Sequence, residues 1–274
     1  MQRRLPDYLK RPIIDTDKTR TVRKILKTKC LNTVCENARC PNKNECYTKN
    51  TATFLIMGGD CTRNCKYCNI NCAKPNPLDP QEPKHVAEAV QALGLKYAVI
   101  TSVTRDDLPD GGAEHFANCI YEIRKICPNT KIEILTPDFK GNKNSLDLII
   151  KAHPDVFNHN IETIKSLYPK ARQMADYETT LDVLKYMKQS GLITKSGFML
   201  GLGESFEEIK ELILDLAKTD LDILTVGQYI RPSLKHLEVK KYYTNEEYLK
   251  IENFIKENTS ILPVVAPLAR SSYR

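Results

Sequence analysis

The chain carries the sequence Cys61-Thr-Arg-Asn-Cys65-Lys-Tyr-Cys68 shortly after the apolar run 53–57, so three cysteines are spaced C-x3-C-x2-C. Three thiolates this close can bind three corners of a cubane 4Fe-4S cluster, and no fourth cysteine follows at a regular interval. The fourth iron would then stay open to a substrate or cofactor. The spacing therefore favours chemistry at the cluster over simple electron relay. The alternatives are incidental buried thiols or a zinc site.

A second cysteine group lies upstream, where Cys35, Cys40 and Cys46 are spaced C-x4-C-x5-C. Thiolates are soft ligands that suit iron-sulfur clusters or zinc, and packing alone does not explain three within twelve residues. We therefore predict a second metal cluster. The alternative is a structural zinc site completed by a distant histidine, although such sites usually contain C-x2-C pairs.

These motifs resemble the radical S-adenosylmethionine (SAM) superfamily and, within it, the lipoyl synthase family. The C-x3-C-x2-C group carries the first resemblance, and the segment from Cys35 to Cys68 carries the second. Further matching blocks occur in order along nearly the whole chain, at 102–107, 158–163, 201–204, 227–233 and 270–273, the last reading Arg-Ser-Ser-Tyr. Several blocks in the same order make chance an unlikely source of the similarity.

The resemblance implies sulfur insertion at C6 and C8 of an octanoyl chain that is amide-linked to a lysine of a lipoyl-carrier protein. It implies two 4Fe-4S clusters and SAM: Cys61, Cys65 and Cys68 hold the cluster that works with SAM, and Cys35, Cys40 and Cys46 hold an auxiliary cluster that supplies sulfur. The fourth ligand of the auxiliary cluster would be Ser271 or Ser272. Taken alone, a serine pair near a chain end is usually part of a solvated tail.

The resemblance also implies partners. They are an octanoylated E2 domain of a dehydrogenase complex or the H protein of the glycine-cleavage system, and an electron donor such as ferredoxin or flavodoxin. We expect a monomeric sulfurtransferase.

Residues that would contact SAM are expected at the ends of strands. The glycines Gly201 and Gly203 allow close approach of the backbone, although a lone G-x-G is as often a turn. Asn158, Asn160 and Glu162 offer polar groups, with a helix-capping loop as the alternative.

A further candidate is Arg105, whose guanidinium can hold a carboxylate through two hydrogen bonds. Asp106, Asp107 or Asp110 would serve equally well as its partner.

Short β-branched runs alternate with amphipathic stretches, which predicts an α/β fold of βα units with a parallel sheet. Six strands are expected at 51–57, 97–101, 131–135, 156–158, 193–200 and 223–226. Helices are expected near 85–93, 113–126, 145–152, 179–190, 206–217 and 243–255. Six units are too few for a closed eight-stranded barrel, so we predict a partial (β/α)6 barrel with its functional loops at the carboxyl ends of the strands.

Three parts are expected along the chain: an N-terminal extension at 1–50, the barrel at 51–235, and a helix and tail at 236–274. The extension and the tail would close the barrel mouth. Of the other cysteines, Cys119 and Cys127 are expected to be ordinary buried side chains. Cys30 and Cys72 lie close enough in sequence to a triplet to bind its cluster in place of the proper ligand.

Composition indicates a cytoplasmic enzyme. The 274 residues are 41% hydrophobic, enough for one large core. No apolar run reaches the roughly 18 residues of a membrane span, and the basic start lacks the apolar segment of a secretory signal. Six of the ten cysteines fall in metal-like triplets, which argues for a reducing compartment rather than disulfides.

Other functions remain as alternatives. A methylthiotransferase would need extra domains, and a biotin synthase-like enzyme is the other radical SAM candidate. An electron carrier or cluster scaffold would need neither the barrel nor its loops. The net charge of +7 suggests nucleic acid, but the basic residues are dispersed and the chain has no Trp, so no nucleic-acid partner is expected.

Overall fold

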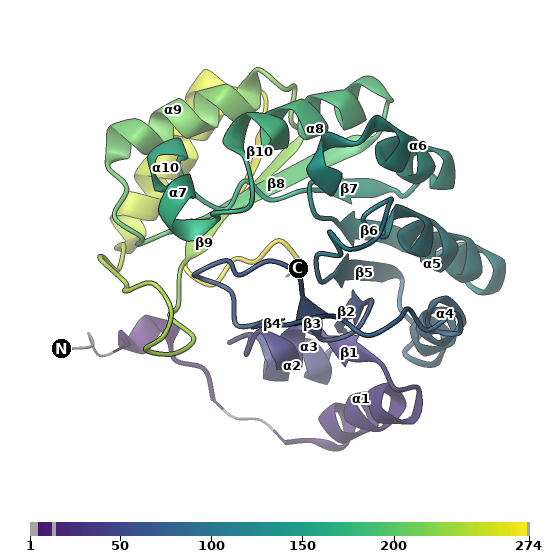
Figure 1. Cartoon of the computed structure of the whole chain (residues 1–274). Helices are drawn as coiled ribbons and strands as arrows, with labels where there is room; N and C mark the ends of the chain where they lie inside the picture. The colour runs from purple at the N-terminus through teal and green to yellow at the C-terminus, as the bar shows by residue number, and fades with distance from the viewer. Residues whose placement is uncertain (1–4, 13–14, 273–274) are drawn as a thin grey trace. The chain divides into compact units, whose positions relative to one another are not determined.

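The computed structural model describes residues 5–12 and 15–272, and these divide into two compact units (Figure 1). The N-terminal unit contains 11–12, 15–63 and 70–157. The C-terminal unit contains 5–10, 64–69 and 158–272. The boundary at 63–64 falls inside the C-x3-C-x2-C motif, so the two units contribute different cysteines.

The sheet of the N-terminal unit has the strand order β1-β2-β5-β6-β7. Strands β2, β5 and β6 are parallel, with Thr53 opposite Val99 and Tyr97 opposite Lys131, whereas β1 is antiparallel to β2. All four residues of β2 are buried, as expected for a parallel strand that is covered on both faces. The bounds are β1 (Asn32–Thr33), β2 (Thr53–Ile56), β5 (Tyr97–Ser102), β6 (Lys131–Leu135) and β7 (Val156–Asn158).

Three helices lie side by side along this sheet, with α5 between α4 and α6 (Figure 1). The buried positions of α5 include Ala113, Phe116, Ile120 and Ile123, which recur every three or four residues and form the apolar face. The bounds are α4 (Glu82–Ala92), α5 (Ala113–Ile126) and α6 (Lys143–Ala152), with a 3-10 turn η2 (Phe139–Gly141) before α6. The predicted helices are confirmed here, although α4 begins three residues earlier than expected.

The segment before β2 is largely helical. Its helices are α1 (Asp17–Thr28), α2 (Val34–Asn37) and α3 (Lys43–Thr48). A capping box between Thr16 and Thr19 starts α1. After β2, a small parallel pair of β3 (Asp60–Cys61) and β4 (Asn71–Cys72) carries the first cysteine of the C-x3-C-x2-C motif. None of these elements was predicted from the sequence. The helices α2 and α3 and the strands β3 and β4 are too short to show a hydrophobic period, whereas α1 spans 12 residues and its period was missed.

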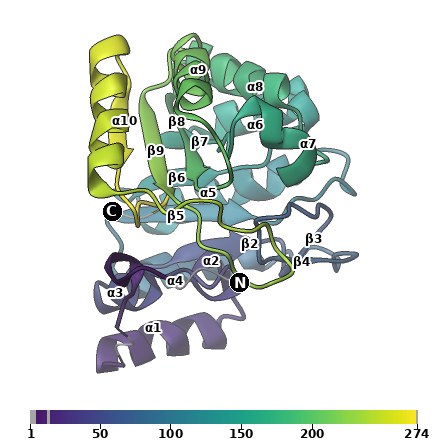
Figure 2. The same cartoon turned by 90° about the vertical axis from the view of Figure 1, so that its left-hand side faces the viewer.

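In the C-terminal unit, β8 (Ile193–Leu200), β9 (Ile223–Gln228) and β10 (Leu262–Val265) form a parallel array. Its helices are α7 (Tyr168–Ala171), α8 (Tyr177–Gln189), α9 (Phe206–Ala217) and α10 (Asn245–Asn258), with 3-10 turns η1 (Asp7–Leu9) and η3 (Lys165–Leu167). Capping boxes start α9 at Ser205 and α10 at Thr244, and α10 lies along β10 (Figure 2).

The sequence analysis missed β10. Pro263 lies in the middle of this strand and cannot donate a ladder hydrogen bond, which is tolerated on an edge strand. Leu262 and Val264 are exposed, as is usual at an edge. The region 263–274, expected as a tail, therefore begins with a strand. Within the described residues, no helix has the length and apolar character needed to cross a membrane.

Candidate functional site

The second cysteine group lies in the N-terminal unit on and between two short helices. Cys35 is on α2, Cys46 is on α3, and the Cys40 N–H donates to the Cys35 carbonyl at 3.2 Å. Burial raises the pKa of Cys35 to about 12, and the nearby thiols of Cys40 and Cys46 push it the same way, against an N–H bond from Thr53. Burial and the charge of Cys40 likewise raise the pKa of Cys46 to about 11.

The charges of Cys40 and Cys46 both act on Cys35, although no three cysteine, histidine or carboxylate side chains of the described residues are placed as ligands of one metal ion. Three neighbouring thiolates repel each other in a buried site, so cations are needed to stabilise the deprotonated form. A soft, all-sulfur donor set of this kind fits an iron-sulfur cluster. We predict that Cys35, Cys40 and Cys46 hold the auxiliary cluster.

The first cysteine of the C-x3-C-x2-C motif has a sulfur atom that accepts two backbone hydrogen bonds. Cys61 Sγ accepts from the N–H groups of Arg63 at 3.4 Å and Thr104 at 3.3 Å. Hydrogen bonds to the coordinating sulfur atoms tune the potential of iron-sulfur clusters. The surroundings of Cys61 therefore fit a cluster ligand.

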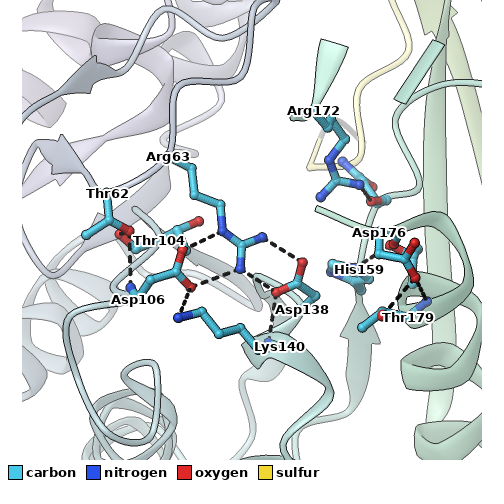
Figure 3. A network of polar contacts seen from close by, with 12 residues as sticks. Thr62, Arg63, Thr104, Asp106, Asp138, Lys140, His159, Arg172, Asp176 and Thr179 are labelled. Atoms are coloured by element: carbon cyan, nitrogen blue, oxygen red, sulfur yellow. Dashed lines mark hydrogen bonds and ion pairs between the residues drawn. The ribbon is translucent and has the colours of Figure 1, made fainter. Parts of the chain in front are cut away.

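The arginine of the same motif is held by two carboxylates in the N-terminal unit (Figure 3). Arg63 Nε donates to Asp106 at 2.7 Å, and its two Nη atoms donate to Asp138 at 2.6 and 2.7 Å. Only 4% of the Arg63 side chain and 3% of that of Asp138 are exposed. Burial by itself would lower the pKa of Arg63, but the hydrogen bonds that it donates to Asp138 and Asp106 raise it well above its usual value. The network fixes the loop that follows Cys61.

Replacing Arg63 with methionine should lower the free energy of unfolding by about 3–5 kcal/mol, because it leaves the buried Asp138 without its cation, whereas Asp106 keeps only the cation of Lys140 at 3.7 Å among the described residues. Guanidinium unfolding of the metal-free protein measures the change. Arg20→Met is the control, since Arg20 pairs with Asp15 on the surface and its loss should change little. Equal stability of the two variants would contradict the structural role of Arg63.

The other two cysteines of the motif lie in a turn that is held within the C-terminal unit. His236 Nε2 donates to the Cys68 carbonyl at 2.9 Å, and its Nδ1 pairs with the Ser233 hydroxyl at 2.9 Å. A carbonyl only accepts, so Nε2 carries a proton. The backbone of Lys66 donates to the Ala171 carbonyl and accepts from the Leu237 N–H, both at 2.9 Å. The turn that carries Cys65 and Cys68 is therefore fixed by its backbone.

A polar group lies in the C-terminal unit, in the residues that come after β7 in the chain. Asn160 Nδ2 donates to Glu162 Oε1 at 3.1 Å, and Arg172 Nη1 donates to the Asn160 carbonyl at 3.0 Å. Burial raises the pKa of Glu162, against the opposing effects of Arg172 and Asn160. Burial would lower the pKa of Arg172, but Tyr67, Tyr168, Glu162 and Cys65 raise it well above its usual value.

Arg172 Nε is buried and has no hydrogen-bond partner among the described residues. A guanidinium that faces both Glu162 and Cys65 and keeps one unused donor suits a carboxylate ligand such as the methionyl end of SAM. Glu162 does not cap a helix, since Ile164 is the cap of the next helical turn. Asn158 is also fully buried in this unit, at the end of β7.

Ser271 is tied to this polar group. Its hydroxyl donates to Asn160 Oδ1 at 2.8 Å, and its carbonyl accepts from Lys195 Nζ at 2.5 Å. A Cβ atom at Gly197 would lie 2.9 Å from Ser271 Oγ, so only glycine leaves room for the serine there. Ser271 is thus held in place rather than solvated. Ser272 is half-buried, and Tyr273 lies outside the described residues.

The tail before Ser271 packs closely on β9. The Gln228 N–H donates to the Pro267 carbonyl at 2.9 Å, and a Cβ atom at Gly227 would lie 2.2 Å from the Ala269 carbonyl oxygen. The strand and the tail can approach this closely only because residue 227 has no side chain.

Gly227→Ala should therefore displace the tail. We expect amide hydrogen exchange at 266–272 to become at least about tenfold faster, because the lost contacts lower the free energy of local opening. Exchange measured by mass spectrometry checks this, with Gly59→Ala as control, since a Cβ there meets only the flexible end of Asn37 at 3.4 Å. Unchanged protection of the tail would contradict the packing argument.

The remaining predicted contacts to SAM have partners within the chain. Arg105 donates to both carboxylate oxygens of Asp107 at 2.9 and 2.8 Å, which leaves its buried Nη1 without a partner among the described residues. The N–H groups of Gly201 and Gly203 both donate to the Glu204 carboxylate, as in a self-contained turn. Their roles toward SAM stay predictions.

The other cysteines differ in their surroundings. Cys119 is fully buried, as expected, whereas Cys127 is half-buried. Cys30 is exposed, and the exposed Cys72 lies opposite Cys61 in the β3–β4 pair. The expectation that Cys72 lies close to a cysteine triplet therefore agrees with its pairing opposite Cys61.

Sequence reasoning did not find Arg63, Asp138, Arg172, Lys195 or His236. Most of these residues lie in loops or at strand ends near the predicted motifs. Their position near the motifs was the one sequence feature that could have pointed to them. Single polar residues in loops are so common, however, that this position alone does not identify a functional residue.

Comparison with known proteins gives the family. The profile of the Radical SAM superfamily matches residues 55–216. Lipoyl synthase of Caldanaerobacter subterraneus subsp. tengcongensis is 48% identical over 98% of this chain and 95% of its own length. Lipoyl synthase of Caldicellulosiruptor bescii is 50% identical over 98% of this chain and 93% of its own length.

Solved structures show the fold. Streptococcus suis SuiB bound to S-adenosylmethionine has a TM-score of 0.61 at 13% identity, over 82% of this chain and 54% of that chain. Methylornithine synthase (PylB) has a TM-score of 0.59 at 15% identity, over 89% of this chain and 74% of that chain. The predicted α/β fold of the radical SAM type is confirmed. The closure of its mouth by the extension and tail stays a prediction.

Two 4Fe-4S clusters and SAM are the cofactors of this family, as predicted. The resemblance seen in the sequence motifs is confirmed over nearly the full length of the chain. The chain belongs to the lipoyl synthase family of radical SAM enzymes.

Proposed function

We propose that this chain inserts sulfur at C6 and C8 of an octanoyl group bound to a lysine of a carrier protein. Similarity to lipoyl synthases over 98% of the chain is the observation that carries this proposal. The two cysteine triplets support it, because each needs one non-cysteine partner to complete a cluster.

When bound, the clusters and SAM supply a carbon radical strong enough to remove hydrogen from unactivated C–H bonds, together with the sulfur that is inserted. In our proposal Cys61, Cys65 and Cys68 hold the first cluster and leave one iron for SAM. Cys35, Cys40 and Cys46 hold the auxiliary cluster, with Ser271 or Ser272 as the fourth ligand. A harder oxygen donor should leave iron more easily than a thiolate does.

The polar residues of the C-terminal unit would orient SAM. Arg172 carries a buried positive charge, and its Nε donor has no partner in the described part of the chain, which suits the SAM carboxylate. Asn160 and Glu162 accept hydrogen bonds that suit its amino group or ribose. Tyr67, packed against Leu202 and Tyr229, helps to exclude water from the turn between Cys65 and Cys68. Asn158, Arg105, Gly201 and Gly203 remain proposed contacts.

Octanoylated carrier proteins are the substrates of this family. We propose an E2 domain or an H protein as the carrier, ferredoxin or flavodoxin as the electron donor, and a monomeric enzyme. A reducing cytoplasm suits ten cysteines that form no disulfide in the structure. We also propose the three-part organisation 1–50, 51–235 and 236–274.

Anaerobic reconstitution with iron and sulfide, followed by reaction with SAM, dithionite and an octanoyl-lysine peptide, tests the proposal. Mass spectrometry should show two sulfur atoms gained and two hydrogen atoms lost. SAM cleavage without sulfur in the peptide would indicate another radical SAM reaction. No cleavage of SAM by the cluster-loaded protein would refute the enzyme class.

A further inference from the structure

A basic pocket of about 290 Å³ lies within the C-terminal unit, beside the turn that carries Cys65 and Cys68. Its wall combines the turn at Lys66, helix α7 with its preceding residues, and the loop 231–240 that follows β9. Four lysines line it, together with three leucines and one carboxylate. This volume is at the lower end for ligand sites in proteins.

The positive charge of the pocket is largely uncompensated. Glu238, its one carboxylate, pairs with Lys240 at 2.6 Å. Lys66, Lys170 and Lys235 form no ion pair within the described part of the chain, and the last two are exposed. Three ammonium groups around one hollow attract carboxylates strongly at low ionic strength.

The pocket touches the cluster-binding turn without being part of the proposed active site. Lys66 lies between Cys65 and Cys68, and the loop wall reaches the same turn through His236 Nε2 and the Cys68 carbonyl at 2.9 Å. None of the residues proposed to hold a cluster or SAM lines the pocket. A protein bound there would therefore contact the same turn that carries two of the proposed cluster ligands, without contacting any residue proposed to hold a cluster or SAM.

We propose that this pocket receives the carboxylate side chains of a small acidic protein that donates single electrons to the cluster held by Cys61, Cys65 and Cys68. The inference rests on the proposed function, which requires such a cluster. One electron leaves the donor protein and enters the cluster, and no bond or proton is exchanged. Electron transfer needs only proximity, whereas an acyl-lysine arm must enter the active site, so the position favours the electron donor over the carrier.

The loop also suits a transient protein contact. Leu234, at its tip, is 70% exposed and lies next to Lys235. Arg231 holds the tip by donating to the Leu234 carbonyl at 2.6 Å and the His236 carbonyl at 2.9 Å. Small, electrostatically steered interfaces are typical of electron-transfer pairs.

The variant Lys170→Glu/Lys235→Glu tests the inference in the cluster-loaded protein. Stopped-flow absorbance should show that flavodoxin hydroquinone reduces the cluster at least about tenfold more slowly than in the wild type at low salt, with a smaller difference at several tenths molar salt. Reduction by dithionite should be unchanged. The matched control is Lys185→Glu/Lys250→Glu, which makes the same charge change at exposed positions of α8 and α10 and should have little effect.

An unchanged rate with flavodoxin would overturn the proposal. So would equal slowing in the control variant, which would indicate net charge rather than this pocket. Weakened binding of an octanoylated carrier protein with normal reduction by flavodoxin would assign the pocket to the carrier instead. If the charge reversal lowers the iron content, Lys170→Gln/Lys235→Gln replaces it, and a rate equal to that of the wild type then decides against the proposal.

Failure of this inference is separable from failure of the proposed function. Wild-type protein driven by dithionite reports sulfur insertion into the octanoyl-lysine peptide without any protein donor.

Discussion

Replacing Cys61, Cys65 and Cys68 with alanine should abolish the reductive cleavage of SAM and halve the bound iron, from about eight to about four atoms per chain. The reason is that SAM needs an iron with an open position, and in our proposal only this triplet leaves one, because a serine completes the auxiliary cluster. Iron analysis and chromatography of the SAM cleavage products measure the two effects.

Cys119→Ala is the matched control, because Cys119 is a fully buried cysteine outside both triplets. It should keep the full iron content and SAM cleavage. Intact SAM cleavage in the triple variant would show that the radical SAM assignment of these three residues is wrong.

Replacing Cys35, Cys40 and Cys46 with alanine should preserve SAM cleavage and remove sulfur insertion entirely. Radical generation needs only the first cluster, whereas the sulfur would come from the auxiliary one. The iron content should again fall to about half. The outcome is read by comparing SAM cleavage products with the mass of the octanoyl-lysine peptide. Sulfur insertion at the wild-type level would place the sulfur source elsewhere.

Ser271 and Ser272 can be tested by the same comparison of SAM cleavage with sulfur insertion, because one of them is the proposed fourth ligand of the auxiliary cluster. Replacing Ser271 and Ser272 together with alanine should spare SAM cleavage and stop sulfur insertion. The single variants then separate two roles of the tail. Ser271→Ala removes the hydrogen bond to Asn160, and Ser272→Ala does not. Normal dithiolane yield from the double variant would show that neither serine is needed.

Much of the fold was predictable because long elements repeat their apolar residues. The strands at 131–135, 156–158 and 193–200 and the helices at 113–126 and 206–217 occur as predicted. Strand β10 and the helices α1 to α3 were not predicted. The strand is an exposed edge with a proline in it. The helices α2 and α3 span only four and six residues, too few to show a period.

The candidate cluster ligands were predictable for a different reason. Their spacing along the chain is a local property, and cysteines a few residues apart can meet at one metal site whatever the rest of the fold does. The place of Ser271 was not predictable from residues alone. Its hydroxyl meets Asn160, 111 positions earlier, because the tail follows β9 past Gly227.

Local sequence thus established the family, the thiolate donors and the βα alternation, since each depends on neighbours within one loop or one period. It did not establish how those donors are held. Arg63 finds its carboxylates 43 and 75 residues away, at Asp106 and Asp138. These partners meet because the parallel strands β5 and β6 are neighbours and the loops after them lie at the same edge of the sheet. Ion pairs between residues so far apart in sequence depend on the order of the strands in the sheet. That order cannot be derived from the spacing of residues along the chain.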